Sequence, residues 1–110
     1  MNAMPKWPKN ADGDALRRIW NSKADFTKEH LVDFQIDFRQ ILPVDAVLEL
    51  LRKRYGEVNV VPSCSTGRGY VEISKRMMLD YDEIVAMQQS LTDLTRPFGG
   101  WCECWGMLDG

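Results

Sequence analysis

The sequence predicts an α+β domain in which two helices cover one face of a four-stranded antiparallel sheet, with one further short helix in front. Segments with strand periodicity and segments with helical periodicity follow one another in the order β-α-β-β-α-β. The chain has 110 residues, which is enough to bury one hydrophobic core and too few for two. We therefore expect a single globular unit.

Residues 1–30 are predicted to form an arm and a short helix, followed by the globular domain over residues 31–110. The first ten residues, MNAMPKWPKN, contain two prolines, two lysines and no periodicity. In the stretch ADGDALRRIWNSK, Asp12 or Asp14 can cap a helix. The apolar stripe of this helix consists of Leu16, Ile19 and Trp20. This stripe requires another apolar surface to pack on.

The first half of the domain reads as a strand followed by a helix. Residues 32–38, VDFQIDF, alternate between apolar and polar residues, as expected of a strand with one buried face. A helix is predicted from about residue 43 to residue 55. It begins at Pro43 and ends before Gly56, with basic residues in its last turn.

The second half supplies a hairpin, a helix and a last strand. EVNVV, from Glu57, and YVEISK, from Tyr70, are rich in β-branched residues and flank the turn residues STGRG. Asp80 and Glu83 form a D-x-x-E capping box for a helix that ends at Pro97, and WCECWGM forms the last strand. This order is the split βαβ, ferredoxin-like pattern, with its first and third strands central and its fourth strand beside the first.

Alternation predicts which side chains the helices leave uncovered. If the apolar residues of the first and third strands face the helices, their polar neighbours lie on the opposite face. In the last strand, inward-facing Cys102 and Cys104 would keep the Glu103 carboxylate out of the core. The predicted protein-binding surface is therefore Asp33, Asp37, Tyr70, Glu72, Trp101, Glu103 and Trp105. The alternative is that the N-terminal helix covers these aromatic residues.

Charge and composition exclude several classes of function. The formal net charge is −2, and residues 31–110 carry eight basic against twelve acidic side chains. The chain lacks the basic footprint of a nucleic-acid binder, and acids beside the aromatic residues would repel phosphate. No stretch approaches the roughly 20 apolar residues needed to span a membrane. The chain has three cysteines, an odd number that does not suggest the disulfide framework of a secreted protein. We therefore expect reduced thiols and a cytoplasmic protein.

Metal and catalytic sites receive little support from the residue pattern. Cys102 and Cys104 form C-x-C, and Cys64 with His30 would be needed to complete a zinc site. No second pair with ligand spacing accompanies them, so we expect no metal and no cofactor. Neither a Cys-His pair nor a carboxylate pair is supported as a catalytic site, and we expect a protein that is not an enzyme.

The ending FGGWCECWG, together with the order of elements from Leu31 to Leu108, resembles the RraB family of ribonuclease E inhibitors, called regulator of ribonuclease activity B. The stretch NADGDALRRI followed by VDFQIDF is also similar to longer-armed members. The resemblance implies a non-catalytic ferredoxin-like domain that binds the C-terminal scaffold region of ribonuclease E and slows RNA decay. Gly100 and Trp101 match the Gly-Trp pair after the last helix of the family.

One departure from the family concerns charge. The best-known kind of member is strongly acidic and ends in an acidic tail, whereas this chain is near neutral and stops at Asp109-Gly110. We therefore expect weaker electrostatic capture of a basic scaffold.

Other functions remain open from sequence alone. The acidic domain could mask a basic nuclease as an immunity protein or antitoxin. A cavity near Cys64, Cys102 and Cys104 could serve a small-molecule or metal sensor. The apolar edge strand EVNVV could pair with a second copy, which would give a monomer or weak homodimer.

Overall fold

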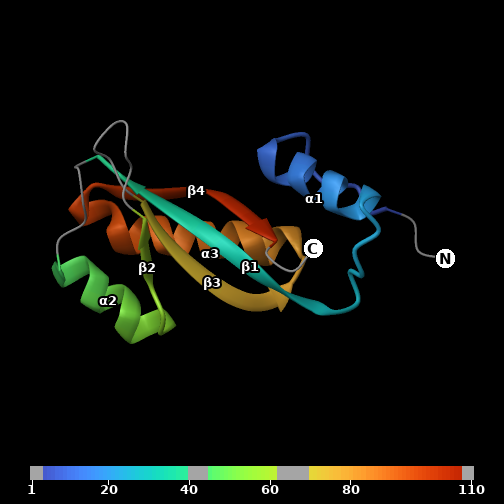
Figure 1. Cartoon of the computed structure of the whole chain (residues 1–110). Coiled ribbons are helices and arrows are strands. Elements are labelled where there is room, and N and C mark those ends of the chain that lie inside the picture. The colour runs from blue at the N-terminus through green and yellow to red at the C-terminus, as the bar shows by residue number, and fades with distance from the viewer. Residues whose placement is uncertain (1–3, 40–44, 62–69, 108–110) are drawn as a thin grey trace.

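The computed structural model describes residues 4–39, 45–61 and 70–107. Within them lie three α-helices, one short 3-10 helix and four strands (Figure 1). In chain order these are α1 (Ala11–Asn21), β1 (Glu29–Phe38), α2 (Asp45–Tyr55), β2 (Asn59–Val61), β3 (Tyr70–Met78), α3 (Tyr81–Thr95), η1 (Arg96–Phe98) and β4 (Gly100–Met107). The predicted α+β class and the β-α-β-β-α-β order after the first helix are confirmed.

The four strands form one antiparallel sheet with the order β2-β3-β1-β4. The first and third strands are central and the fourth lies beside the first, as the ferredoxin-like pattern predicts. Strand β1 begins at Glu29, three residues before the alternating stretch, and β3 continues to Met78. These extensions lengthen the two central strands beyond the predicted ones.

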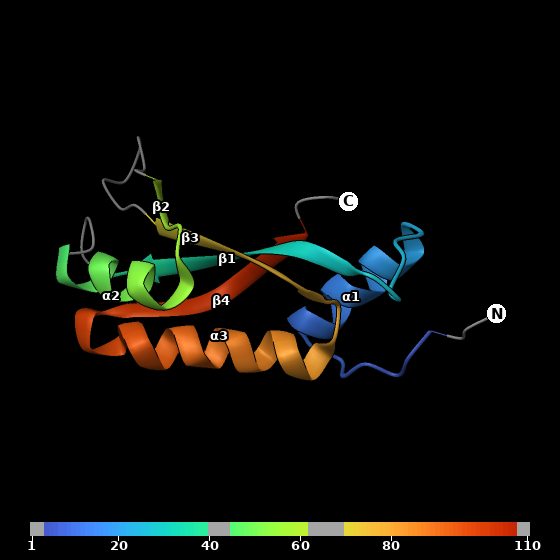
Figure 2. The same cartoon turned by 90° about the horizontal axis from the view of Figure 1, so that it is seen from below.

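The hydrophobic core lies on one face of the sheet. Helix α3 runs along this face, and α1 lies beside the end of β4 at the edge of the sheet (Figure 1 and Figure 2). Every second residue of β1 from Val32 to Phe38 is buried, and so are Val71 and Ile73 of β3. The helices contribute the buried side chains Leu16, Val47, Leu48, Leu51, Ile84, Met87 and Leu91. Burial of this apolar surface, at about 25 cal/mol per Å², supplies the main stabilisation of the fold.

The two helix starts differ in how well the sequence predicted them. The Asp80 side chain caps α3, accepting a hydrogen bond from the Glu83 amide at 3.0 Å, as the capping box predicts. The predicted caps of α1, Asp12 or Asp14, are wrong. Asn10 takes that role by accepting from the Gly13 amide at 2.9 Å, because its side-chain oxygen precedes the first helical residue. Pro43 lies outside the described residues.

Helix α1 is attached to α3 and β4 by polar contacts around one carboxylate. Asp12 Oδ1 accepts hydrogen bonds from Gln88 Nε2 at 3.0 Å and from Trp105 Nε1 at 2.9 Å. Leu16 is fully buried in the shared core. The N-terminal helix therefore packs against α3 and β4. It contacts Trp105, one of the aromatic residues that the alternative placed beneath it.

The Gly99-Gly100 pair serves two different purposes. Gly99 has a φ of 79°, the left-handed conformation that lets the chain leave η1. Gly100 is instead required by packing, because a Cβ there would lie 2.7 Å from Thr95 Cβ and 2.8 Å from Phe38 Cε1. The glycine of the Gly-Trp pair thus permits close contact between β4, α3 and β1.

Candidate functional site

The face of the sheet opposite the helices, called here the open face, carries most of the predicted binding residues. Strand register places Tyr70, Asp37 and Trp101 in one row across three strands. The next row contains Glu72, Gln35 and Cys104, and a third contains Ser74 and Asp33. Five of the seven predicted residues therefore share this face: Asp33, Asp37, Tyr70, Glu72 and Trp101.

A β-bulge in β4 overturns the predicted placement of the other two residues. Gln35 pairs with Cys104, whereas Ile36 pairs with Cys102, which leaves Glu103 as an extra residue without a partner on β1. One extra residue reverses the alternation of every side chain that follows it. Cys104 therefore lies on the open face, and Trp105 pairs with Phe34 on the helix-covered face.

The bulge gives Trp105 and Glu103 surroundings that strict alternation did not predict. Trp105 packs against the core and donates its indole hydrogen bond to Asp12. Glu103 is exposed and lines a hollow between the start of α1 and helix α3. Trp105 therefore leaves the candidate site, and Glu103 has no register partner on the open face. The sequence did not predict this outcome, because strict alternation with Glu103 kept out of the core also directs Trp105 outward.

Asp33 is the most constrained acid of the open face. Its side chain is half-buried, and its Oδ1 atom is buried without a hydrogen-bond partner among the described residues. Burial, followed by the nearby negative charge of Glu72, raises the pKa of the Asp33 carboxyl, and hydrogen bonding to Ser74 offsets part of this. The folded protein thus holds a carboxylate in a position that disfavours its charged form.

Tyr70 belongs to the same electrostatic environment. Burial is the main cause that raises the pKa of its phenol, followed by the charge of Glu72, hydrogen bonding to Glu72, and the charges of Asp33 and Asp37. Gln35 Nε2 donates to Asp37 Oδ1 at 3.2 Å. The open face therefore combines a tyrosine and a tryptophan with three carboxylates, of which Asp33 and Glu72 repel each other.

A surface hollow of about 440 Å³ adjoins these acids beside β2. Its lining includes Tyr55 at the end of α2 and Glu57 from the segment between α2 and β2, as well as Glu72 and Leu31 of the sheet. Asn59 Nδ2 donates to Glu72 Oε2 at 3.5 Å at its edge. Sequence reasoning did not assign Glu57, Tyr55 or Asn59 to the site, because only the folded connection brings them to this face.

The two cysteines of β4 lie on opposite faces of the strand. Cys102 is buried, and burial raises the pKa of its thiol to about 12. Cys104 is exposed, and the pKa of its thiol is also raised, first by burial and then by the charge of Asp37. Among the described residues no group of three or more His, Cys, Asp or Glu could hold a metal ion, and Cys64 lies outside them.

Fold and site together define a small α+β domain with a ferredoxin-like sheet, one face of which is free of helices and carries acids and aromatics. A family model described as "Regulator of ribonuclease activity B" matches residues 9–107. The chain belongs to this family, and the predicted membership is confirmed. No curated protein matches the chain. Within the described residues no helix is long and apolar enough to cross a membrane.

Proposed function

We propose that this protein regulates a ribonuclease by binding to it, and that the open face carries the contact. The partner is ribonuclease E, bound at its C-terminal scaffold region, and the protein itself is cytoplasmic and performs no catalysis. Family membership over residues 9–107 is the observation that carries this proposal. Occlusion or displacement on the scaffold is then the mechanism of regulation.

The electrostatics of the open face support a basic partner. Asp33, Asp37 and Glu72 lie close enough for their charges to raise the pKa values of neighbouring groups. A cationic surface placed over them would offset the repulsion between Asp33 and Glu72. Charge complementarity of this kind increases the association rate and selects the partner.

The aromatic residues of the open face support a protein partner. Trp101 and Tyr70 are half-buried, so each presents part of its ring to solvent. Tryptophan and tyrosine are the residues most often found as anchors of protein interfaces. Both belong to the row that contains Asp37, which places aromatic surface beside negative charge.

Calorimetric titration with the C-terminal scaffold region of ribonuclease E from the same organism, at two salt concentrations, tests the proposal. We expect saturable binding that weakens at the higher salt concentration, because counterions screen exposed charges. Absence of binding in both buffers would refute ribonuclease E as the partner while leaving family membership unaffected.

A matched pair of variants tests the open face itself. The double substitution Asp33→Asn with Asp37→Asn is expected to weaken binding between about twofold and thirtyfold, since each exposed ion pair contributes about 0.2–1 kcal/mol. Asp45→Asn with Glu49→Gln is the control, because it removes two exposed charges from helix α2 and none from the open face. Equal affinities for the parent protein and the double variant would remove the open face from the proposal.

A further inference from the structure

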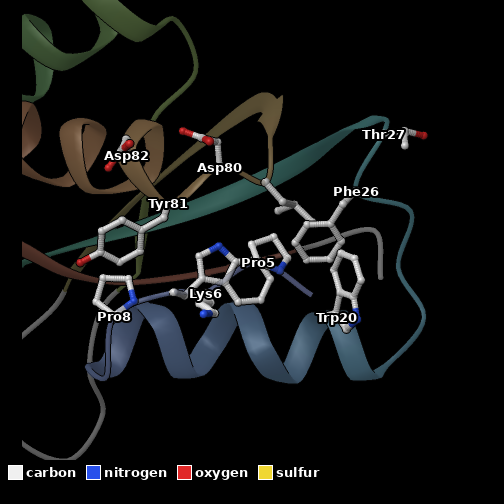
Figure 3. A pocket seen from close by; sticks show the side chains of 11 residues that line it. Pro5, Lys6, Pro8, Trp20, Phe26, Thr27, Asp80, Tyr81 and Asp82 are labelled. Atoms are coloured by element: carbon white, nitrogen blue, oxygen red, sulfur yellow. The ribbon is translucent and has the colours of Figure 1, made fainter. Parts of the chain in front are cut away.

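A third hollow lies at the end of the molecule where the N-terminal arm passes between α1 and the start of α3. Its volume is about 780 Å³. Figure 3 shows Pro5, Lys6 and Pro8 of the arm on one side of it and Asp80, Tyr81 and Asp82 on the other. The arm forms one wall, so the hollow exists because the arm is held in place.

Specific contacts hold the arm on α1. Arg17 donates from Nη1 to the carbonyl oxygen of Trp7 at 3.0 Å and from Nη2 to that of Pro8 at 3.1 Å. A Cβ on Gly13 would lie 1.9 Å from the Pro8 oxygen, so the arm crosses the helix where a side chain is absent. Asn10 Nδ2 also donates to the Tyr81 hydroxyl at 2.8 Å. The wall is therefore built by the helix beneath it.

Aromatic rings supply much of the surface of the hollow. Trp7 packs against Phe26 with ring centroids 5.7 Å apart and against Trp20 at 6.1 Å. These three rings and that of Tyr81 are half-buried, so part of each faces the hollow. Such ring faces carry partial negative charge and attract cations.

The charged rim has a net negative charge. Asp80 and Asp82 stand against the single cation Lys6. Asp80 uses one carboxylate oxygen, Oδ2, to cap α3. Asp82 is exposed and makes no hydrogen bond or ion pair with other described residues. Both acids also stabilise the N-terminus of α3. This role explains the two carboxylates, but it does not explain the aromatic rings on the other side of the hollow.

We propose that this hollow binds the side chain of an arginine carried by a peptide segment of a partner. A guanidinium group is planar, stacks on aromatic faces and is more weakly hydrated than the ammonium of lysine. Its positive charge is complementary to the rim formed by Asp80 and Asp82, and its plane can stack on the exposed rings. The combination of ring surface and negative rim therefore favours arginine over lysine and over neutral side chains.

This site is separate from the open face and does not rest on the proposed function. Residues Pro5 to Pro8, which form one wall, precede the family match at residues 9–107. Membership of the family therefore does not by itself account for the wall that the arm forms. The Asp33→Asn, Asp37→Asn double variant is expected to bind arginine like the parent protein.

The test uses the peptide acetyl-Gly-Arg-Gly-amide and its citrulline counterpart, which has the same shape and no charge. Both are titrated into the full chain while the indole and amide resonances are followed by NMR. We expect a saturable shift of the Trp7 indole and Tyr81 amide signals, with the citrulline peptide binding at least about fivefold more weakly. Equal binding of both peptides, no saturable shift up to about 20 mM, or a main effect at Trp101 would overturn the proposal.

Single substitutions then test how much the charged residues of the rim contribute to the affinity for the arginine peptide. Asp82→Asn is expected to weaken the arginine peptide by about threefold, and Lys6→Ala to strengthen it by up to about threefold. Asp45→Asn is the matched control, since Asp45 is an exposed acid in the first turn of α2. Unchanged affinity in Asp82→Asn would contradict the site. If a variant fails to fold, the comparison of the two peptides on the parent protein still decides.

Discussion

The residues on the two faces of the sheet have different explanations: core packing accounts for those on one face but not for those on the other. On the helix-covered face, Val32, Phe34 and Ile36 of β1 are completely buried, and their apolar surface stabilises the fold. On the open face of the same strand, Asp33, Gln35 and Asp37 are half-buried polar residues. Packing explains the first set fully. The second set contains like charges that the fold does not require.

Asp33 shows the difference most clearly. Its buried Oδ1 atom has no partner among the described residues, and burial raises its pKa. A neutral or apolar residue at this position would serve the fold better, because a desolvated carboxylate opposes folding. The open face therefore carries groups whose benefit we place in binding, at a small cost in stability.

The largest expected effect concerns close packing on the helix-covered side of β4. Gly100→Ala should lower the free energy of unfolding by about 2–3 kcal/mol, because the new methyl group overlaps Thr95 and Phe38. Gly106→Ala is the control within the same strand, since a Cβ there meets nothing within 4 Å. Urea denaturation measures both. Similar stabilities of the two variants would contradict the packing assigned to Gly100.

The two tryptophans of β4 offer a test of the bulge. Trp105→Phe removes the indole hydrogen bond to Asp12 and should cost about 1–2 kcal/mol of unfolding free energy. Trp101→Phe on the open face should change stability by less than about 0.5 kcal/mol. If Trp101 proved the more costly to replace, the two residues would have to exchange faces.

Thiol reactivity gives an independent measure of the same register. Cys104 is exposed and Cys102 is buried with a pKa of about 12. In the folded protein at mildly alkaline pH, Cys104 should be alkylated at least about tenfold faster than Cys102, because the thiolate is the reacting species and must be accessible. Peptide mapping by mass spectrometry follows each site. Equally slow alkylation of both cysteines would contradict the bulge and support a regular strand in which both side chains face the core.

The smallest expected effect is the gain from removing the Asp33 charge. Asp33→Asn should raise the free energy of unfolding at neutral pH by no more than about 0.5 kcal/mol, since solvent screens a half-exposed group. The pKa of Asp33 is raised above 3.8, so the folded state keeps this proton where the unfolded state has lost it. The contribution of Asp33 to stability thus falls as the pH rises from 3.8 through the folded pKa.

Denaturation curves between about pH 4 and pH 7 compare the parent protein with Asp33→Asn. The stability difference should grow in favour of the variant as the pH rises. A difference that is constant over this range would mean that Asp33 titrates alike in both states.

The sequence predicted the central strands well because alternation over β1 has no exception. Four open-face residues followed from that alternation and from the same pattern in β3, and Trp101 precedes the bulge in β4. The placement of Glu103 and Trp105 failed because a bulge inserts one residue without leaving a distinct signal in the sequence. Asn10 was overlooked as a cap because two aspartates follow it. The arginine-binding hollow could not be foreseen, since it depends on where the arm crosses Gly13.

The central claim is that open-face acids serve binding and not stability. Asp33→Asn tests it when both quantities are measured on one preparation: affinity for the ribonuclease E scaffold region by calorimetry, and unfolding free energy by urea denaturation. We predict opposite signs, with weaker binding and equal or higher stability. A variant that binds as tightly as the parent protein, or one that loses stability together with affinity, would contradict the claim.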